Sequence, residues 1–245
     1  MTHQISDIAQ EFNGKNFFSK ARQSYIETPL KELGFRKYKS ATVARLTKGN
    51  VFQFLNFQKA AYGGQSFNVN VAIRPLFCVN NNYLVLSPGN SLGELSKDYK
   101  RDKWWYYRTK EEGDRSFVDV FNQLEKYAIP FFEATETSAE IINASRKNIF
   151  GVSKFGDRVS WGILGGRKNF DFGHICLHNG QIDKAIKHFT ACNKEFKKDE
   201  RDWARNIAFE SLKINNIIKS GQSHIDQYIS DTIRNSKVNL NLIDW

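Results

Sequence analysis

Residues 66–74 show the strictest alternation of apolar and polar side chains in the chain. The apolar set is Phe67, Val69, Val71 and Ile73, and the polar set is Ser66, Asn68, Asn70 and Arg74. A period of two is typical of a strand with one buried face and one wet face. The pattern therefore predicts a half-buried antiparallel strand whose amides and arginine face solvent. Pro75 argues against continuation of a central strand.

Two further strands are predicted at 41–47 and 51–59, separated by a turn at 48–50. In 51–59 both alternating sets are apolar, which indicates a central strand covered on both sides. A second turn lies at 61–65, and a weaker strand is expected at 83–86. The segment 87–114 mixes turn residues, charges and aromatic rings, and is predicted to be a long loop or a strand at the edge of the sheet.

Helical periodicity flanks these strands. A helix is expected over 16–33, with Thr28 and Pro29 starting a second short helix and Gly34 ending it. Another helix runs from 115 until Pro130 ends it, and a further one covers 134–144. The glycine-rich and aromatic stretch 149–166 reads as a connector. The fold class is thus α+β, with an antiparallel sheet packed with helices in a domain at 1–148 and a mainly helical region at 149–245.

One helical hairpin in the second region is clearly predicted by the spacing of its small and large residues. In 169–196, Gly173 and Ala185 are small residues that allow two antiparallel helices to approach, Gly180 marks the turn, and Phe189 fills the gap. The spacing resembles one tetratricopeptide unit. No second copy follows, so an ordinary helical hairpin is the favoured interpretation. The last helix is expected over 222–235, and the tail is predicted to fold back through Leu242 and Trp245.

Charge changes this picture in one place. The chain has a net charge of +10, and residues 15–59 carry ten Lys or Arg against only Glu27 and Glu32. A solvated basic face is the favoured interpretation, although such a region can also attract nucleic acid, an acidic protein or an anionic membrane. The sequence predicts no transmembrane helix and no secretory signal. Three scattered cysteines indicate reduced thiols in a cytoplasmic protein.

A family resemblance follows from several motifs. The chain reads "LKELGFRKY", then "FQFLNFQKAAYGGQSFNVNVAI", then "WW" at 104–105 and "VFNQLEKYAIPFFEATETSAEII" at 120–142. Together these resemble the bacterial domain-of-unknown-function family 4304, over about residues 15–145. The resemblance implies an α+β domain of bacterial cytosolic origin. It implies no chemistry, and the remainder of the chain lies outside it.

The polar end of the second strand, with Asn56, Gln58 and Lys59, is a candidate for a metal-dependent nuclease site. Such sites need carboxylates to hold Mg²⁺, and the strands at 41–47, 51–59 and 66–74 contain no Asp or Glu. The alternative is that Gln58 and Lys59 close the strand. Two roles are predicted for Asn68, Asn70 and Arg74. They bind a ligand or partner, or they hydrogen-bond to the aromatic loop that covers them.

Cations and rings interleave in that loop, which contains Lys100, Arg101, Trp104 and Trp105. This combination is typical of single-stranded nucleic-acid contacts and of protein hot spots. Two adjacent Trp residues on a strand point to opposite sides, so at least one is expected in the core. His174 and His178 lie four residues apart, a spacing that suits zinc, but ordinary packing is the favoured interpretation and no metal or cofactor is expected.

Two hypotheses result. The first is a non-catalytic bacterial cytosolic binding module with a protein partner, in toxin neutralisation or defence, although the positive charge counts against neutralising a nuclease toxin. The alternative is a nucleic-acid-binding protein with a basic, aromatic-rich surface, extending to a cryptic nuclease. We expect the protein not to be an enzyme and assign no catalytic residues. We also expect no membrane partner.

Overall fold

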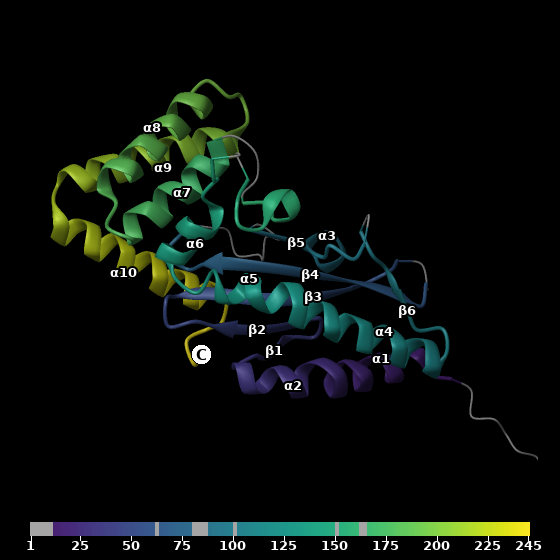
Figure 1. Ribbon diagram of the computed structural model, residues 1–245. Helices are drawn as coiled ribbons and strands as arrows, with labels where there is room; N and C mark the ends of the chain where they lie inside the picture. The colour runs from purple at the N-terminus through teal and green to yellow at the C-terminus, as the bar shows by residue number, and fades with distance from the viewer. Residues whose placement is uncertain (1–11, 62–63, 80–87, 100–101, 150–151, 162–165) are drawn as a thin grey trace, which may run out of the picture.

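An antiparallel sheet organises the molecule. The computed structural model describes residues 12–61, 64–79, 88–99, 102–149, 152–161 and 166–245 (Figure 1). The six strands of the sheet run in the order β1-β2-β3-β4-β5, with β6 also paired to β4. They are β1 (Arg36–Lys39), β2 (Thr42–Leu46), β3 (Val51–Lys59), β4 (Ser66–Pro75), β5 (Gly89–Ser91) and β6 (Trp105–Tyr106). Three of these confirm predicted strands, whereas β1 was missed and the expected strand at 83–86 lies outside the described residues.

Helices from two parts of the chain cover one face of the sheet. They are α1 (Gly14–Arg22), α2 (Thr28–Leu30), α4 (Lys110–Gln123) and α5 (Ile129–Glu133), which lie along the strands in Figure 1. The main core forms between them and the sheet. Phe67 on β4 is fully buried there, with its ring centroid 4.9 Å from that of Phe117 and 5.1 Å from that of Phe18. Aromatic burial of this kind contributes strongly to stability.

The prolines do not break these helices, contrary to prediction. A π-helical turn, η1 (Gln23–Glu27), continues directly into α2, and the Thr28 backbone is helical instead of forming an N-cap. A second π-helical turn, η3 (Leu124–Ala128), precedes Pro130 in the same way. Because a π turn is wider than an α turn, it relieves the clash between the proline ring and the carbonyl one turn earlier. Gly34 ends the first helix as predicted, with a φ of 81°.

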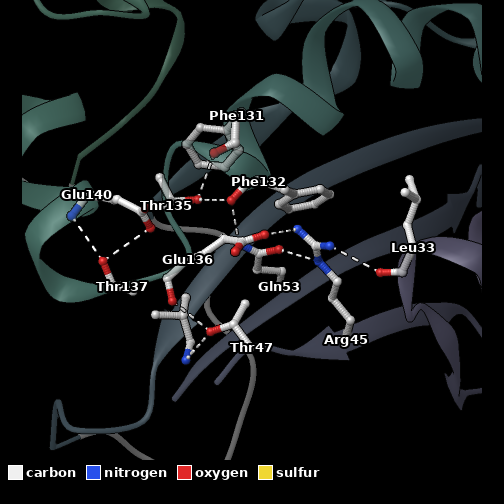
Figure 2. Close-up of polar contacts among 11 residues, drawn as sticks. Leu33, Arg45, Thr47, Gln53, Phe131, Phe132, Thr135, Glu136, Thr137 and Glu140 are labelled. Atoms are coloured by element: carbon white, nitrogen blue, oxygen red, sulfur yellow. Dashed lines mark hydrogen bonds and ion pairs between the residues drawn. The ribbon is translucent and has the colours of Figure 1, made fainter. Parts of the chain in front are cut away.

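Side chains from neighbouring strands satisfy the carbonyl groups at the ends of these helices (Figure 2). Arg45 on β2 donates to the Leu33 carbonyl over 3.1 Å, to Gln53 Oε1 over 2.7 Å and to Glu136 over 2.8 Å. The buried Gln53 in turn donates to the Phe132 carbonyl over 2.6 Å. The last carbonyls of a helix lack partners within it, so this network fixes both helix ends onto the sheet.

The predicted wet face of β4 is wrong. All ten residues of the strand are buried, including Asn68, Asn70 and Arg74. At one end, the segment before β6 lies against Asn68 through Asp102 and Lys103. At the other end, the C-terminal tail packs on the same face, where Leu240 and Leu242 join a smaller core cluster. Alternation alone cannot show this, because the covering segments are remote in sequence.

The C-terminal region is helical, as predicted. After the short α3 (Leu92–Leu95) and α6 (Ser138–Ser145), the chain forms α7 (Gly166–His178), α8 (Ile182–Phe196), α9 (Asp202–Lys219) and α10 (Gln222–Asn239). The hairpin of α7 and α8 confirms the small-residue contact, because a Cβ at Gly173 would lie 2.6 Å from the Phe189 ring. Gly180 adopts a φ of 69° in the turn.

The tail after α10 folds back onto the sheet, which confirms the prediction for Leu242 and Trp245. Tyr38 on β1 donates to the Leu240 carbonyl over 2.7 Å, and the Arg36 guanidinium lies 3.9 Å from the centre of the Trp245 ring. The helical region therefore shares a core with the sheet, and the domain division at residue 148 stays a prediction. The described helices include none long and apolar enough to span a bilayer.

Candidate functional site

A row of polar side chains crosses the sheet on the face opposite α1 and α4. In the strand register Asn56 pairs with both Thr42 and Asn70, and Asn70 pairs with Ser91. Asn56 Nδ2 donates to Thr42 Oγ1 over 3.2 Å, and Asn70 Nδ2 donates to Gln58 Oε1 over 3.4 Å. Directly opposed residues of antiparallel strands share a face. These amides therefore hydrogen-bond chiefly across the strands.

Asn68 connects this row to the loop that covers it. Its Nδ2 atom donates to Asp102 Oδ1 over 2.7 Å and to the Lys103 carbonyl over 2.9 Å. The side chain is 3% exposed. Two roles were predicted for the strand amides, and for Asn68 the structure shows the second, a hydrogen bond to the aromatic loop.

Lys59 and Arg74 do not join the amides. Lys59 is adjacent to Gln58 and points to the other face, where its ammonium lies 4.1 Å from the centre of the Phe18 ring. Burial, followed by the nearby Arg22 and Lys15, lowers the pKa of Lys59. Arg74 is on the amide face but pairs with Phe52 at the opposite end of the strand. Within the described ranges, no group of three His, Cys, Asp or Glu side chains could hold a metal ion.

The aromatic loop contributes mainly to the core. Trp105 is buried and its Nε1 donates to Asp119 Oδ2 over 2.8 Å, which confirms that one of the two Trp residues is internal. Trp104 is half-buried, and Tyr106 is the exposed ring of β6. Lys100 and Arg101 lie outside the described residues.

The two histidines considered for zinc contact different elements. His174 is buried, with Nδ1 2.8 Å from the Phe170 carbonyl and Nε2 3.0 Å from the Tyr228 hydroxyl. The carbonyl can only accept, so Nδ1 donates and Nε2 accepts from Tyr228. His178 instead stacks on Phe77 and bonds Ser138. Burial lowers the pKa of His174 to about 4.

Asp171, also on α7, has a pKa displaced in the opposite direction. Burial raises its pKa from 3.8 to about 6, and this outweighs the attraction of Arg167, whose Nε lies 3.3 Å from a carboxylate oxygen. Loss of hydration raises the pKa of this half-buried carboxyl group more than the attraction of Arg167 and Arg74 lowers it.

Asp171→Asn should reveal this shift as a change in pH dependence. A pKa raised on folding contributes stability that is fully present below pH 3.8 and is lost as the pH rises through 6. Relative to the variant, the wild type should therefore gain about 2 kcal/mol of unfolding free energy between pH 7 and pH 4. Urea unfolding of both proteins at each pH measures the difference, in which titrations common to both cancel. A difference that does not vary with pH would contradict the assignment.

The sequence interpretation missed one exposed apolar surface, on α9. Phe209 and Leu212 are 66% and 51% exposed, and they border a hollow of about 340 Å³. We define the α9 surface as the residues that line this hollow: Phe209, Leu212, Lys213, Asn216, Ile217, Ser220 and His224. A signal was available, because α9 has apolar residues on more sides than a one-sided helix requires.

The architecture is thus that of a mixed α+β protein, with an antiparallel sheet and a helical C-terminal region. Residues 26–134 match the model of a family described as "Domain of unknown function (DUF4304)". The match confirms the resemblance over this segment, which includes the elements from α2 to α5, whereas the α9 surface lies outside it. No curated protein and no solved structure matches the chain.

Proposed function

We propose that the chain is a non-catalytic protein-binding module and that the α9 surface is its contact site. The observation that carries this proposal is the exposure of Phe209 and Leu212 beside a hollow on the same helix. Large apolar side chains that cluster on the surface and flank a concavity are typical of sites that bind another protein. Burial of these two side chains would stabilise a complex.

The polar residues that prompted the nuclease hypothesis do not converge on one point. Asn56 donates to Thr42, and Lys59 lies on the opposite face from Gln58. A catalytic group must converge with others on one reacting atom, and these side chains diverge.

Nucleic-acid binding stays a prediction, as does a role in toxin neutralisation or defence. Lys15, Arg22 and Lys59 lie close enough to affect one another and would attract phosphate. Stacking on bases requires accessible rings, however, and Trp105 is buried. We also propose a bacterial cytosolic setting, which the three buried free thiols support.

Photo-crosslinking tests the protein-binding proposal. A benzophenone amino acid in place of Lys213, on the α9 surface, should capture a discrete protein in an extract of the source cells. Adding Phe209→Ser and Leu212→Ser should reduce capture at least tenfold, or about 1.4 kcal/mol of binding free energy. The matched control places the probe at Val118, an exposed apolar position on α4. Equal capture from both positions would refute the proposal.

A further inference from the structure

Three cationic side chains gather where α1 packs against the end of β3. Lys15 and Arg22 lie on the same side of α1 as Phe18, because intervals of three and four residues return to one side of a helix. Lys59, the last residue of β3, places its ammonium 4.1 Å from the centre of the Phe18 ring. We call Lys15, Arg22 and Lys59 the cation cluster.

Arg22 is the member of the cation cluster that the protein holds in place. It is 7% exposed, and its guanidinium lies 5.8 Å from the centre of the Phe57 ring. Its Nε donates to Glu27 Oε1 over 2.7 Å, and its Nη1 donates to the Ser40 carbonyl. The Nη2 atom makes no hydrogen bond with the described residues and is not fully enclosed. Nη2 is therefore a donor that the rest of the side chain orients in advance.

The two lysines also have donors available. Both side chains are exposed, and in the described part of the chain neither ammonium forms a hydrogen bond or an ion pair. The Lys59 ammonium lies over rings, at 4.1 Å from the centre of Phe18 and 6.0 Å from that of Tyr107. A lysine ammonium carries three N–H donors and can turn them toward a ligand.

The protein does not balance the charge of the cation cluster. Among the described residues, Glu27 is the one carboxylate that forms an ion pair with a member of the cluster. Three cations and one carboxylate leave a net charge of +2. Burial lowers the pKa of Lys59, and so do the nearby Arg22 and Lys15, because like charges repel across this site. A bound anion would remove that repulsion.

A phosphate monoester matches both the charge and the donors. Its phosphate group carries a charge of about −2 near neutral pH and three strong acceptor oxygens, and arginine and lysine together are suited to bind it. A phosphodiester of a nucleic-acid backbone carries a single charge. The rings beneath the cluster, Phe18 and Tyr107, are buried and offer no face on which a base could stack. The site therefore favours a terminal phosphate over a nucleic-acid backbone.

We propose that the cation cluster binds the terminal phosphate group of a small phosphorylated molecule, with Arg22 Nη2 and the ammonium groups of Lys15 and Lys59 as its donors. The site is built on α1 and β3, at the far end of the molecule from α9 (Figure 1). It goes beyond the proposed protein-binding function and does not depend on it, so either can fail without the other.

Isothermal titration calorimetry of the full chain with methyl phosphate, at low ionic strength and a pH of about 8, tests the proposal. The wild type should show saturable binding. Lys59→Gln should weaken binding at least tenfold, because it removes a charged donor from the phosphate. The matched control is Lys187→Gln, which removes an exposed lysine from α8 and should leave the affinity unchanged. Absence of saturable binding, or equal weakening by the two substitutions, would overturn the proposal.

Acetylation of the wild type locates the bound phosphate. Methyl phosphate should slow the reaction of Lys15 and Lys59 with an N-hydroxysuccinimide ester, measured by mass spectrometry of peptides, and should leave Lys187 unaffected. Dimethyl phosphate, and a dinucleotide with one phosphodiester and no terminal phosphate, should need at least tenfold higher concentrations for the same protection. Equal protection by either diester would show that the site does not select a terminal phosphate and would overturn the proposal.

Discussion

Phe67→Ala is expected to lower the free energy of unfolding by about 3–5 kcal/mol. Phe67 is fully buried on β4, and its ring packs against those of Phe117 and Phe18 between the sheet and its helices. Removing the ring loses its transfer free energy and leaves a cavity that a sheet held on both faces cannot collapse to fill. Urea unfolding followed by circular dichroism measures the loss.

Phe67→Leu serves as the matched control, because it keeps most of the volume and should cost less than half as much. Equal costs for the two substitutions would contradict the cavity explanation, because Phe67→Leu leaves a much smaller cavity than Phe67→Ala. A loss below 1 kcal/mol for Phe67→Ala would contradict the central position assigned to Phe67.

Leu242→Ala is expected to cost about 2–5 kcal/mol, although the residue lies near the end of the chain. Leu242 is fully buried in the cluster that covers β2, β3 and β4 on the amide face. The neighbouring Ile243 is 69% exposed, so Ile243→Ala should change stability by no more than about 0.5 kcal/mol.

Comparing the two substitutions shows whether the tail packs on the sheet through Leu242. Both shorten an aliphatic side chain in the same segment, and only Leu242 contacts the sheet. Similar effects on the unfolding free energy, by thermal or urea unfolding, would indicate that the tail does not pack as described.

The local architecture could be predicted from the sequence where neighbouring residues decide it. The period of two in 66–74 located β4, and the doubly apolar pattern of 51–59 correctly placed β3 at the centre of the sheet. Gly173 and Phe189 predicted the hairpin of α7 and α8, because close helix contact requires a small residue opposite a large one.

Burial of polar residues could not be predicted, because it depends on segments far away in the sequence. Asn68 is polar and alternates with apolar residues, yet Asp102 and Lys103 cover it from the loop before β6. The α9 surface was missed for the opposite reason. An apolar residue such as Phe209 is expected inside, and periodicity alone does not reveal which face of a helix lacks a neighbour.

The π-helical turns before Pro29 and Pro130 keep the buried side chains of each helix facing the core. Arg22, Ile26 and Leu30 are buried at two successive intervals of four, and Leu124, Ala128 and Phe132 repeat this spacing. In a regular α-helix each such interval rotates the buried stripe by about 40° away from the core. Under-winding of the helix at η1 and η3 cancels the drift. A spacing of four residues between buried side chains, repeated across a proline, therefore indicates an under-wound helix that the proline does not break.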